Sequence, residues 1–162
     1  QLAENYSECQ FVVAAAPGVE AEFYESVVGK TGVKIIYGAT YPLLRVARAA
    51  EVNSGTATLE TALFRVPQVV VYKVFGGRLT MLLKPLLIKT PWVSLVNIIA
   101  QREVVSELLA HNYTLERTDA ELRDILVDGD RRQQILHFYD EIIRTLGPSG
   151  AAERCAEKIA KF

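Results

Sequence analysis

The stretch AEVNSGTATLETALF, residues 50–64, contains in succession the features of a strand end, a tight turn and a helix start. Asn53, Ser54, Gly55 and Thr56 have the small, polar composition of a turn that leaves a strand. The apolar residues that follow have helical spacing: Leu59, Leu63 and Val66. The start of such a helix presents unpaired backbone N–H groups and the positive end of its dipole, and Gly55 lets a ligand approach closely. The stretch therefore predicts an anion site suited to phosphate.

Glu60 lies one helical turn after Thr56, so we expect its carboxylate to face the same mouth, where a ligand diol can donate to it. A nucleotide offers both groups, because it carries a diphosphate and a ribose. The alternative is a capped helix without a ligand. In that case Ser54 or Thr56 satisfies a backbone N–H, and Glu60 only complements the dipole.

The chain alternates between strand-like and helix-like segments up to residue 99. Apolar or β-branched runs predict five strands, at residues 11–15, 33–37, 50–53, 69–72 and 92–99. We expect the first of these strands to be buried on both faces. Residues 19–28 predict an amphipathic helix with Phe23 and Val27 on one side. A second helix should begin at Pro42 and bury Leu43, Leu44 and Ala47. Strict alternation predicts an α/β fold, a Rossmann-like parallel sheet with right-handed crossovers.

Only helices are expected after the last strand. The segments are 103–111, a helix opened by a capping box of Thr118 and Glu121, 130–145, and a last helix after 147–150. We therefore divide the chain into a Rossmann-like ligand-binding domain, residues 1–112, and a C-terminal helical extension, residues 113–162.

Composition narrows the class of ligand. Half of the 162 residues are hydrophobic, which suffices for one domain with a real core. The net charge of −1 gives no overall argument for nucleic acid, whose readers usually carry a basic excess. The two cysteines and two histidines lack metal-ligand spacing, so we expect no metal site, and the cysteines suit a reducing compartment. Neither a signal peptide nor a membrane-spanning segment is predicted.

Residues 79–92 predict a helix that is apolar nearly all round but carries Lys84 and Lys89. Burial under neighbouring helices is the first interpretation, since such helices usually lie in cores. The lysines leave open a second, in which the helix contacts an anionic lipid surface.

Two further loops should lie with the 53–60 turn at the carboxyl edge of the sheet, where ligands of such folds bind. Residues 37–41, with Tyr37 and Gly38, offer backbone groups and aromatic faces for a uracil, or form a plain connecting turn. The other spans residues 97–103: Asn97 should end a strand, and Arg102, beside Glu103, should open a helix and donate to a diphosphate. Arg102 and Lys73 have a second interpretation as ordinary solvated charges.

Three ordered motifs closely resemble the C-terminal half of lipid-A-disaccharide synthases: SGTATLE (54–60), PQVVVYK (67–73), and VSLVNIIAQRE (93–103) with ELL (107–109). The third motif departs from the family at four positions. Val96, Gln101, Ser106 and Ala110 stand where the resemblance leads us to expect proline, glycine, proline and glutamine.

The resemblance implies a metal-independent and cofactor-free inverting glycosyltransferase of the two-domain GT-B type, of which this chain is the UDP-binding part. Such an enzyme transfers 2,3-diacylglucosamine from UDP to 2,3-diacylglucosamine 1-phosphate at the cytoplasmic face of the bacterial inner membrane. It implies substrate-binding roles for ten residues: Tyr37, Gly38, Ser54, Gly55, Thr56, Glu60, Lys73, Asn97, Arg102 and Glu103. The general base, a central strand and a Gly-Ser-Arg loop are expected before Gln1, so we expect these residues alone to be inactive.

Two other hypotheses remain open. A UDP-sugar 2-epimerase shares the architecture and a similar Ser-Gly-x-x-x-Glu turn, although the apolar stretch 79–92 does not suit its soluble sugars. A non-catalytic helical module would instead use residues 103–162 as a dimerisation surface. Binding of UDP separates these classes.

Overall fold

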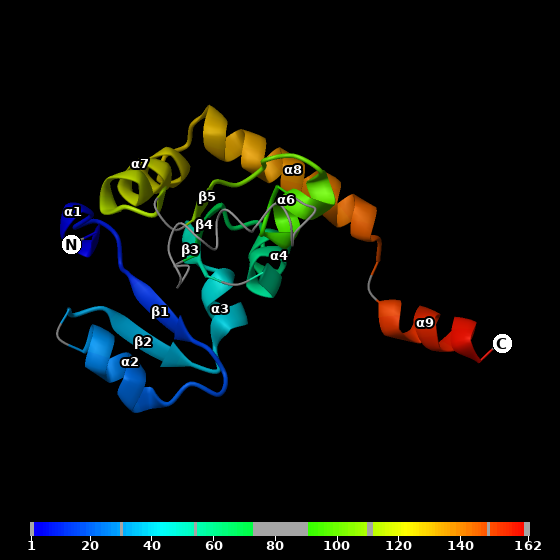
Figure 1. The fold of residues 1–162 in the computed structure, drawn as a ribbon, viewed down its shortest axis with the longest axis horizontal. Coiled ribbons are helices and arrows are strands. Elements are labelled where there is room, and N and C mark those ends of the chain that lie inside the picture. The colour runs from blue at the N-terminus through cyan, green and yellow to red at the C-terminus, as the bar shows by residue number, and fades with distance from the viewer. Residues whose placement is uncertain are drawn as a thin grey trace.

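The computed structural model describes residues 2–29, 31–53, 55–72, 91–109, 112–148 and 150–160. Its strands form two parallel sheets, one of order β1-β2 and one of order β3-β4-β5 (Figure 1). The strands are β1 Val12–Ala15, β2 Lys34–Tyr37, β3 Ala50–Val52, β4 Gln68–Tyr72 and β5 Glu107–Leu109. The prediction of a Rossmann-like α/β fold is confirmed, and its parallel strands are joined by helical crossovers.

The described helices are α1 Leu2–Asn5, α2 Ala21–Val28, α3 Thr40–Leu44, α4 Gly55–Leu63, α6 Leu95–Ala100, α7 Leu115–Leu126, α8 Asp130–Leu146 and α9 Ala151–Ile159. The prediction of a helical C-terminal tail is confirmed. Figure 1 shows α7 and α8 close to the larger sheet, whereas α9 extends away from it.

The core forms around β4. Val69, Val70 and Val71 are all buried although successive residues of a strand point to opposite faces, so β4 is covered on both sides. α4, α6 and α8 pack against one another, and α7 contacts both α8 and β4. Side chains of α7 and α8, among them Ile125 and Tyr139, belong to the same core cluster as the sheet.

α4 forms where the sequence predicted it, with a different buried face. Its buried residues are Thr58, Thr61 and Ala62, whereas Leu63 is exposed. The hydroxyls of Thr58 and Thr61 donate to carbonyls of the preceding turn, so these buried polar groups are satisfied. α6 packs on α4, and the Leu95 N–H of α6 donates to the Thr58 hydroxyl.

Two element assignments were wrong. Residues 92–99 were expected to form a strand, but Ser94 caps a helix, α6, by accepting a hydrogen bond from the Asn97 N–H. Residues 103–111 were expected to form a helix, but Glu107–Leu109 is strand β5, paired with β4. The periodicity of a short apolar run does not distinguish a strand from a helix. Here the Ser94 cap makes residues 95–100 a helix, and pairing with β4 makes residues 107–109 a strand.

The start of α7 was also misplaced. Its N-cap is Thr114, whose hydroxyl accepts from the Arg117 N–H, whereas Thr118 lies inside the helix and donates to the Thr114 carbonyl. Glu121 hydrogen-bonds Ser106 instead of completing a capping box. The predictions for α8 and α9 are confirmed, since these helices begin at Asp130 and just after Gly150.

The smaller sheet is less buried than expected. Of β1 only Ala15 is buried, because β2 is its sole strand partner among the described residues. Along α2, Phe23 and Val27 share a face as predicted but are 60% and 64% exposed. In α3, Leu44 is buried and Leu43 is partly buried, and Ala47, which follows the helix, is also partly buried.

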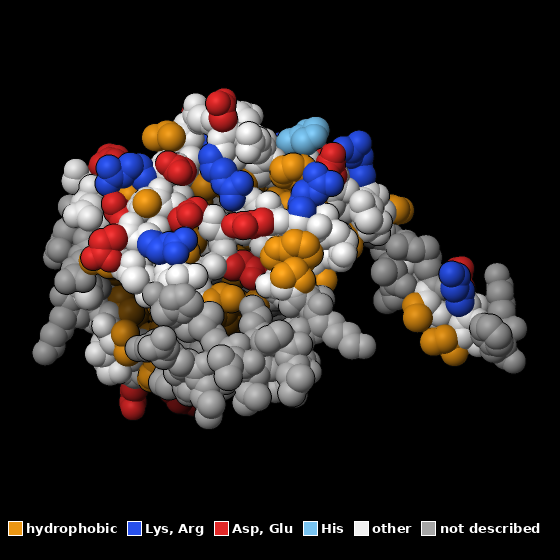
Figure 2. Space-filling model, turned by 45° about the horizontal axis from the view of Figure 1, so that its top comes forward, with side chains coloured by type: hydrophobic (Ala, Val, Ile, Leu, Met, Phe, Trp, Pro, Cys, Tyr) orange, Lys and Arg blue, Asp and Glu red, His pale blue; other side chains and the backbone are white. Residues whose placement is uncertain are grey.

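The helix expected over residues 79–92 lies outside the described residues except for Pro91 and Trp92, and so do Ser54 and Lys73. Within the described part of the chain, no helix is long and apolar enough to cross a membrane. Figure 2 shows acidic and basic side chains intermingled on one face of the molecule.

Candidate nucleotide-binding site

The first turn of α4 lies at the carboxyl edge of the larger sheet, because α4 follows β3 directly. Gly55 begins this helix. A Cβ atom built on Gly55 would lie 3.8 Å from the hydroxyl of Tyr72, the last residue of the neighbouring strand β4. Glycine therefore brings the backbone of the helix start close to Tyr72, and the first turn of a helix presents backbone N–H groups and the positive end of the helix dipole.

Glu60 lies further along α4, beside the segment that follows β2. The Tyr41 hydroxyl donates to Glu60 Oε1 over 3.2 Å, and the Tyr41 ring stacks on Phe64 with centroids 5.3 Å apart. The hydrogen bond to the Glu60 carboxylate raises the pKa of Tyr41 above its ordinary value, because only the protonated phenol can donate to the carboxylate. The structure thus brings the 37–41 loop and α4 together, as an edge site requires.

Residues 37–41 run from the end of β2 through a turn into α3, which begins at Thr40 and not at Pro42 as predicted. Tyr37 ends β2, is 49% exposed and makes a T-shaped contact with the Tyr24 ring. Gly38 has φ 63°, a left-handed conformation that glycine adopts without a Cβ penalty. This turn redirects the chain from β2 into α3, which carries Tyr41.

The start of α6 is a second helix N-terminus near this edge, but the protein fills it with its own carboxylate. Glu107 accepts hydrogen bonds from the N–H groups of Val93 and Ser94, each at 2.9 Å, and from the Ser94 hydroxyl at 2.7 Å. The Thr58 hydroxyl accepts from the Leu95 N–H at 3.2 Å. An external anion would have to compete with Glu107 here, which favours the start of α4 as the anion site.

Asn97 is fully buried, and it lies inside α6 rather than at the end of a strand as predicted. Its side-chain amide donates to the Val105 carbonyl and to Glu107, both at 2.9 Å. Its oxygen accepts from the N–H groups of Val104 and Val105, at 2.8 and 3.0 Å. These four bonds use the full hydrogen-bonding capacity of the amide, so Asn97 fastens α6 to the segment before β5.

Arg102 was expected to open a helix; instead it follows the end of α6, and the next element is β5. Its guanidinium lies 5.1 Å above the Phe138 ring of α8. The adjacent Tyr139 hydrogen-bonds Gln68, the first residue of β4, so this contact lies toward the amino end of the sheet. The described contact of the Arg102 guanidinium is therefore with α8, not with the start of α4.

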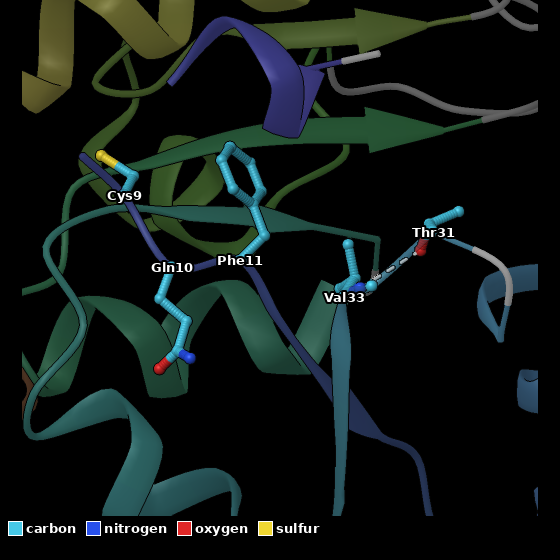
Figure 3. Close-up of a pocket in the computed structure, with 6 residues that line it drawn as sticks. Cys9, Gln10, Phe11, Thr31 and Val33 are labelled. Atoms are coloured by element: carbon cyan, nitrogen blue, oxygen red, sulfur yellow. Dashed lines mark hydrogen bonds between the residues drawn. The ribbon is translucent and has the colours of Figure 1, made fainter. Parts of the chain in front are cut away.

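A shallow hollow of about 270 Å³ lies at the amino ends of β1 and β2, the opposite edge from Tyr37 (Figure 3). Its lining residues are Cys9, Gln10, Phe11, Thr31, Gly32 and Val33. None is charged, so the hollow offers nothing to neutralise a diphosphate. Among the described residues, no group of three or more His, Cys, Asp or Glu side chains could hold a metal ion.

Sequence reasoning included Tyr41 in the 37–41 loop and Glu107 in the third motif, but it missed their contacts with Glu60 and with the start of α6, for which no local pattern gives a signal. Glu107 lies 13 residues after Ser94, and Tyr41 lies 19 residues before Glu60. The four motif departures provided one usable hint. Gln101 stands where the resemblance expects glycine, and it has φ 53° at the C-cap of α6, the conformation that favours glycine.

Comparison with known proteins identifies the family. A sequence profile described as lipid-A-disaccharide synthetase matches residues 1–161. The protein named lipid-A-disaccharide synthase from Syntrophus aciditrophicus is 40% identical over 158 residues, which cover 96% of this chain and 41% of that protein. Proteins of the same name from Myxococcus xanthus and Pseudomonas putida are 38% and 37% identical over 94% and 90% of this chain, and over 40% and 38% of their own lengths.

The chain thus spans about two fifths of the length of these relatives. The match covers nearly all of it and is not confined to the three short motifs. The chain belongs to the lipid-A-disaccharide synthetase family.

Proposed function

We propose that the full-length protein is a lipid-A-disaccharide synthase, a hexosyltransferase of lipid A biosynthesis, and that this chain is its UDP-donor-binding part. The enzyme transfers 2,3-diacylglucosamine from UDP to 2,3-diacylglucosamine 1-phosphate. Family membership supports the reaction class. The observation that carries the donor site is the contrast between two helix starts: Glu107 occupies the start of α6, whereas the start of α4 carries a glycine whose Cβ position lies 3.8 Å from the Tyr72 hydroxyl.

In this proposal the start of α4 binds the diphosphate through Gly55, Thr56 and, by its position in the sequence, Ser54. Glu60 accepts from the ribose hydroxyls, and Tyr37 and Gly38 face the uracil. Lys73 follows β4 directly in the sequence and remains a candidate for the phosphates. Asn97 affects binding indirectly, by holding α6 in position. Arg102 and Glu103 bind the donor only in a complex that brings them closer to the start of α4.

Transfer with inversion requires a base that activates the acceptor hydroxyl and a stabilised leaving group on the opposite side of the sugar. Negative charge grows on the diphosphate as the glycosidic bond breaks, and backbone N–H groups at a helix start stabilise that charge without rearranging. We assign the general base to the part of the protein before Gln1, and no residue of this chain to the proton transfer.

We further propose that the chain is the C-terminal half of a two-domain GT-B-type fold, with residues 1–112 as the Rossmann-like domain and 113–162 as its helical extension. Among the described residues, β1 pairs only with β2, and β3 pairs only with β4. A central strand before Gln1 would fit between β1 and β3 and join the two sheets. Mutating the expected Gly-Ser-Arg loop beside that strand should abolish turnover, and unchanged turnover would contradict this arrangement.

The reaction is tested with the full-length protein, UDP-2,3-diacylglucosamine and 2,3-diacylglucosamine 1-phosphate. The proposal predicts acceptor-dependent release of UDP and a disaccharide product, and Glu60→Gln should weaken UDP binding by about 1.5–3 kcal/mol. Conversion of a UDP-sugar to its epimer without an acceptor would favour an epimerase. Absence of UDP binding would favour a helical interaction module.

Substrates with several acyl chains rest in a bilayer, so we propose that the enzyme works at the cytoplasmic face of the inner membrane. Residues 79–92 either contact that surface or lie in the core. Sedimentation with anionic vesicles separates these two alternatives, because Lys84→Gln with Lys89→Gln should reduce vesicle binding only if the segment touches lipid.

A homodimer through the C-terminal helices is a separate proposal, and a monomeric mass by light scattering would contradict it.

A further inference from the structure

Tyr41 makes two contacts, one with Glu60 of α4 and one with Phe64, the residue that follows this helix. Its hydroxyl donates to Glu60 Oε1 over 3.2 Å. Its ring stacks on Phe64, with centroids 5.3 Å apart and planes inclined by 28°. Glu60 and Phe64 are four residues apart and therefore neighbours on the same helical face. Tyr41 of α3 thus contacts both Glu60, which we propose accepts from the ribose hydroxyls, and Phe64, one helical turn further along the chain.

These two contacts have different consequences. The stack on Phe64 fixes where the phenol ring lies, even though Tyr41 is 51% exposed. The hydroxyl then restricts the Glu60 side chain, which otherwise exchanges among many rotamers. A carboxylate that is held in place before its ligand arrives loses less conformational entropy on binding.

We propose that Tyr41 is a positioning residue for the nucleotide, which holds the Glu60 carboxylate in the orientation that accepts the ribose hydroxyls. The inference rests on the proposed UDP site. A carboxylate has about four acceptor positions, so the bond from Tyr41 occupies one and leaves others for the diol. Tyr41 itself does not touch the reacting atoms, and its effect passes through Glu60.

The chain offers a matched control. The Tyr113 hydroxyl donates to Glu51 Oε1, also over 3.2 Å, and Glu51 belongs to β3 rather than to the proposed site. The two pairs share residue types, bond and distance. Removing the Tyr113 hydroxyl therefore measures what losing such a bond does when no ligand contact depends on it.

The experiment measures calorimetric binding of UDP and of 2′,3′-dideoxy-UDP to the full-length protein. Tyr41→Phe keeps the ring and removes only the hydroxyl, so the melting temperature should change little. UDP affinity should fall about three- to tenfold, the effect of one hydrogen bond and of ordering one side chain. Dideoxy-UDP, which lacks the diol, should bind Tyr41→Phe as well as it binds the unchanged protein. Tyr113→Phe should alter neither affinity.

A double-mutant cycle completes the test, because Tyr41→Phe should cause no further loss in a Glu60→Ala background. Equal losses for both ligands would overturn the inference and make Tyr41 a structural residue. If Glu60→Ala weakens UDP binding and Tyr41→Phe does not, the inference fails while the proposed site stands. If Glu60→Ala leaves UDP binding unchanged, the proposed ribose contact fails and the inference with it. The ratio of the two affinities, measured on one sample, does not depend on how much of a variant is folded.

Discussion

Replacing Gly55 with Asp should affect ligand binding and stability in opposite directions. The φ of Gly55 lies outside the left-handed region, and a Cβ would meet Tyr72 only at 3.8 Å, so a side chain fits without strain. A carboxylate in the first turn of α4 complements the helix dipole and should raise stability by about 0.3–1 kcal/mol relative to Gly55→Asn. The same carboxylate should repel a diphosphate bound there.

The size of the repulsion follows from the distance. A carboxylate about 5 Å from one phosphate charge adds about 0.8 kcal/mol in water and about 3.3 kcal/mol at an effective dielectric of 20. UDP should therefore bind Gly55→Asp between about 4 and 250 times more weakly than Gly55→Asn, which matches it in volume. Calorimetry with UDP and with uridine measures this, and uridine, which carries no phosphate, should discriminate much less. Equal UDP affinities of the two variants would refute an anion site at the start of α4.

Three further substitutions test other parts of the account. Gln101→Gly should raise the free energy of unfolding in urea by about 0.5–1 kcal/mol, since residue 101 has φ 53°; no increase would contradict a strained C-cap. Asn97→Ala should lower it by at least about 2 kcal/mol, because buried partners of the amide lose their bonds; loss of UDP binding at unchanged stability would instead indicate direct ligand contact. Arg102→Ala should cost about 0.5–1 kcal/mol of stability through the lost contact with Phe138 and leave kcat unchanged; a fall in kcat would restore its role as leaving-group stabiliser.

Local patterns predicted the parts of the fold that local interactions determine. β4 is a continuous β-branched run, and α8 has a strong helical period with Gly147 just beyond its end, so both were predicted closely. The strand prediction for residues 92–99 was wrong. Their apolar run suits a strand, but the Ser94 cap and the Glu107 carboxylate stabilise a helix. Glu107 comes from the next strand, and a short sequence window does not contain it.

The residues of the candidate site likewise fall into those that local sequence predicts and those that depend on tertiary contacts. Gly55 and Glu60 follow from one turn and one helix, and both lie on α4 as expected. Arg102 was grouped with them because a strand was expected to end at Asn97; once that segment is a helix, Arg102 follows its C-terminal end and contacts α8 instead. Tyr41 reaches Glu60 only because the turn at Gly38 brings α3 beside α4, which is a tertiary arrangement.

The most direct test of the UDP site is a crystal structure of the full-length protein with UDP. We predict that the diphosphate oxygens lie within hydrogen-bonding distance of the backbone N–H groups at Gly55 and Thr56. The ribose hydroxyls should donate to Glu60, with Tyr41 still bonded to the same carboxylate. A diphosphate bound at Arg102, or at the start of α6 in place of Glu107, would contradict the account.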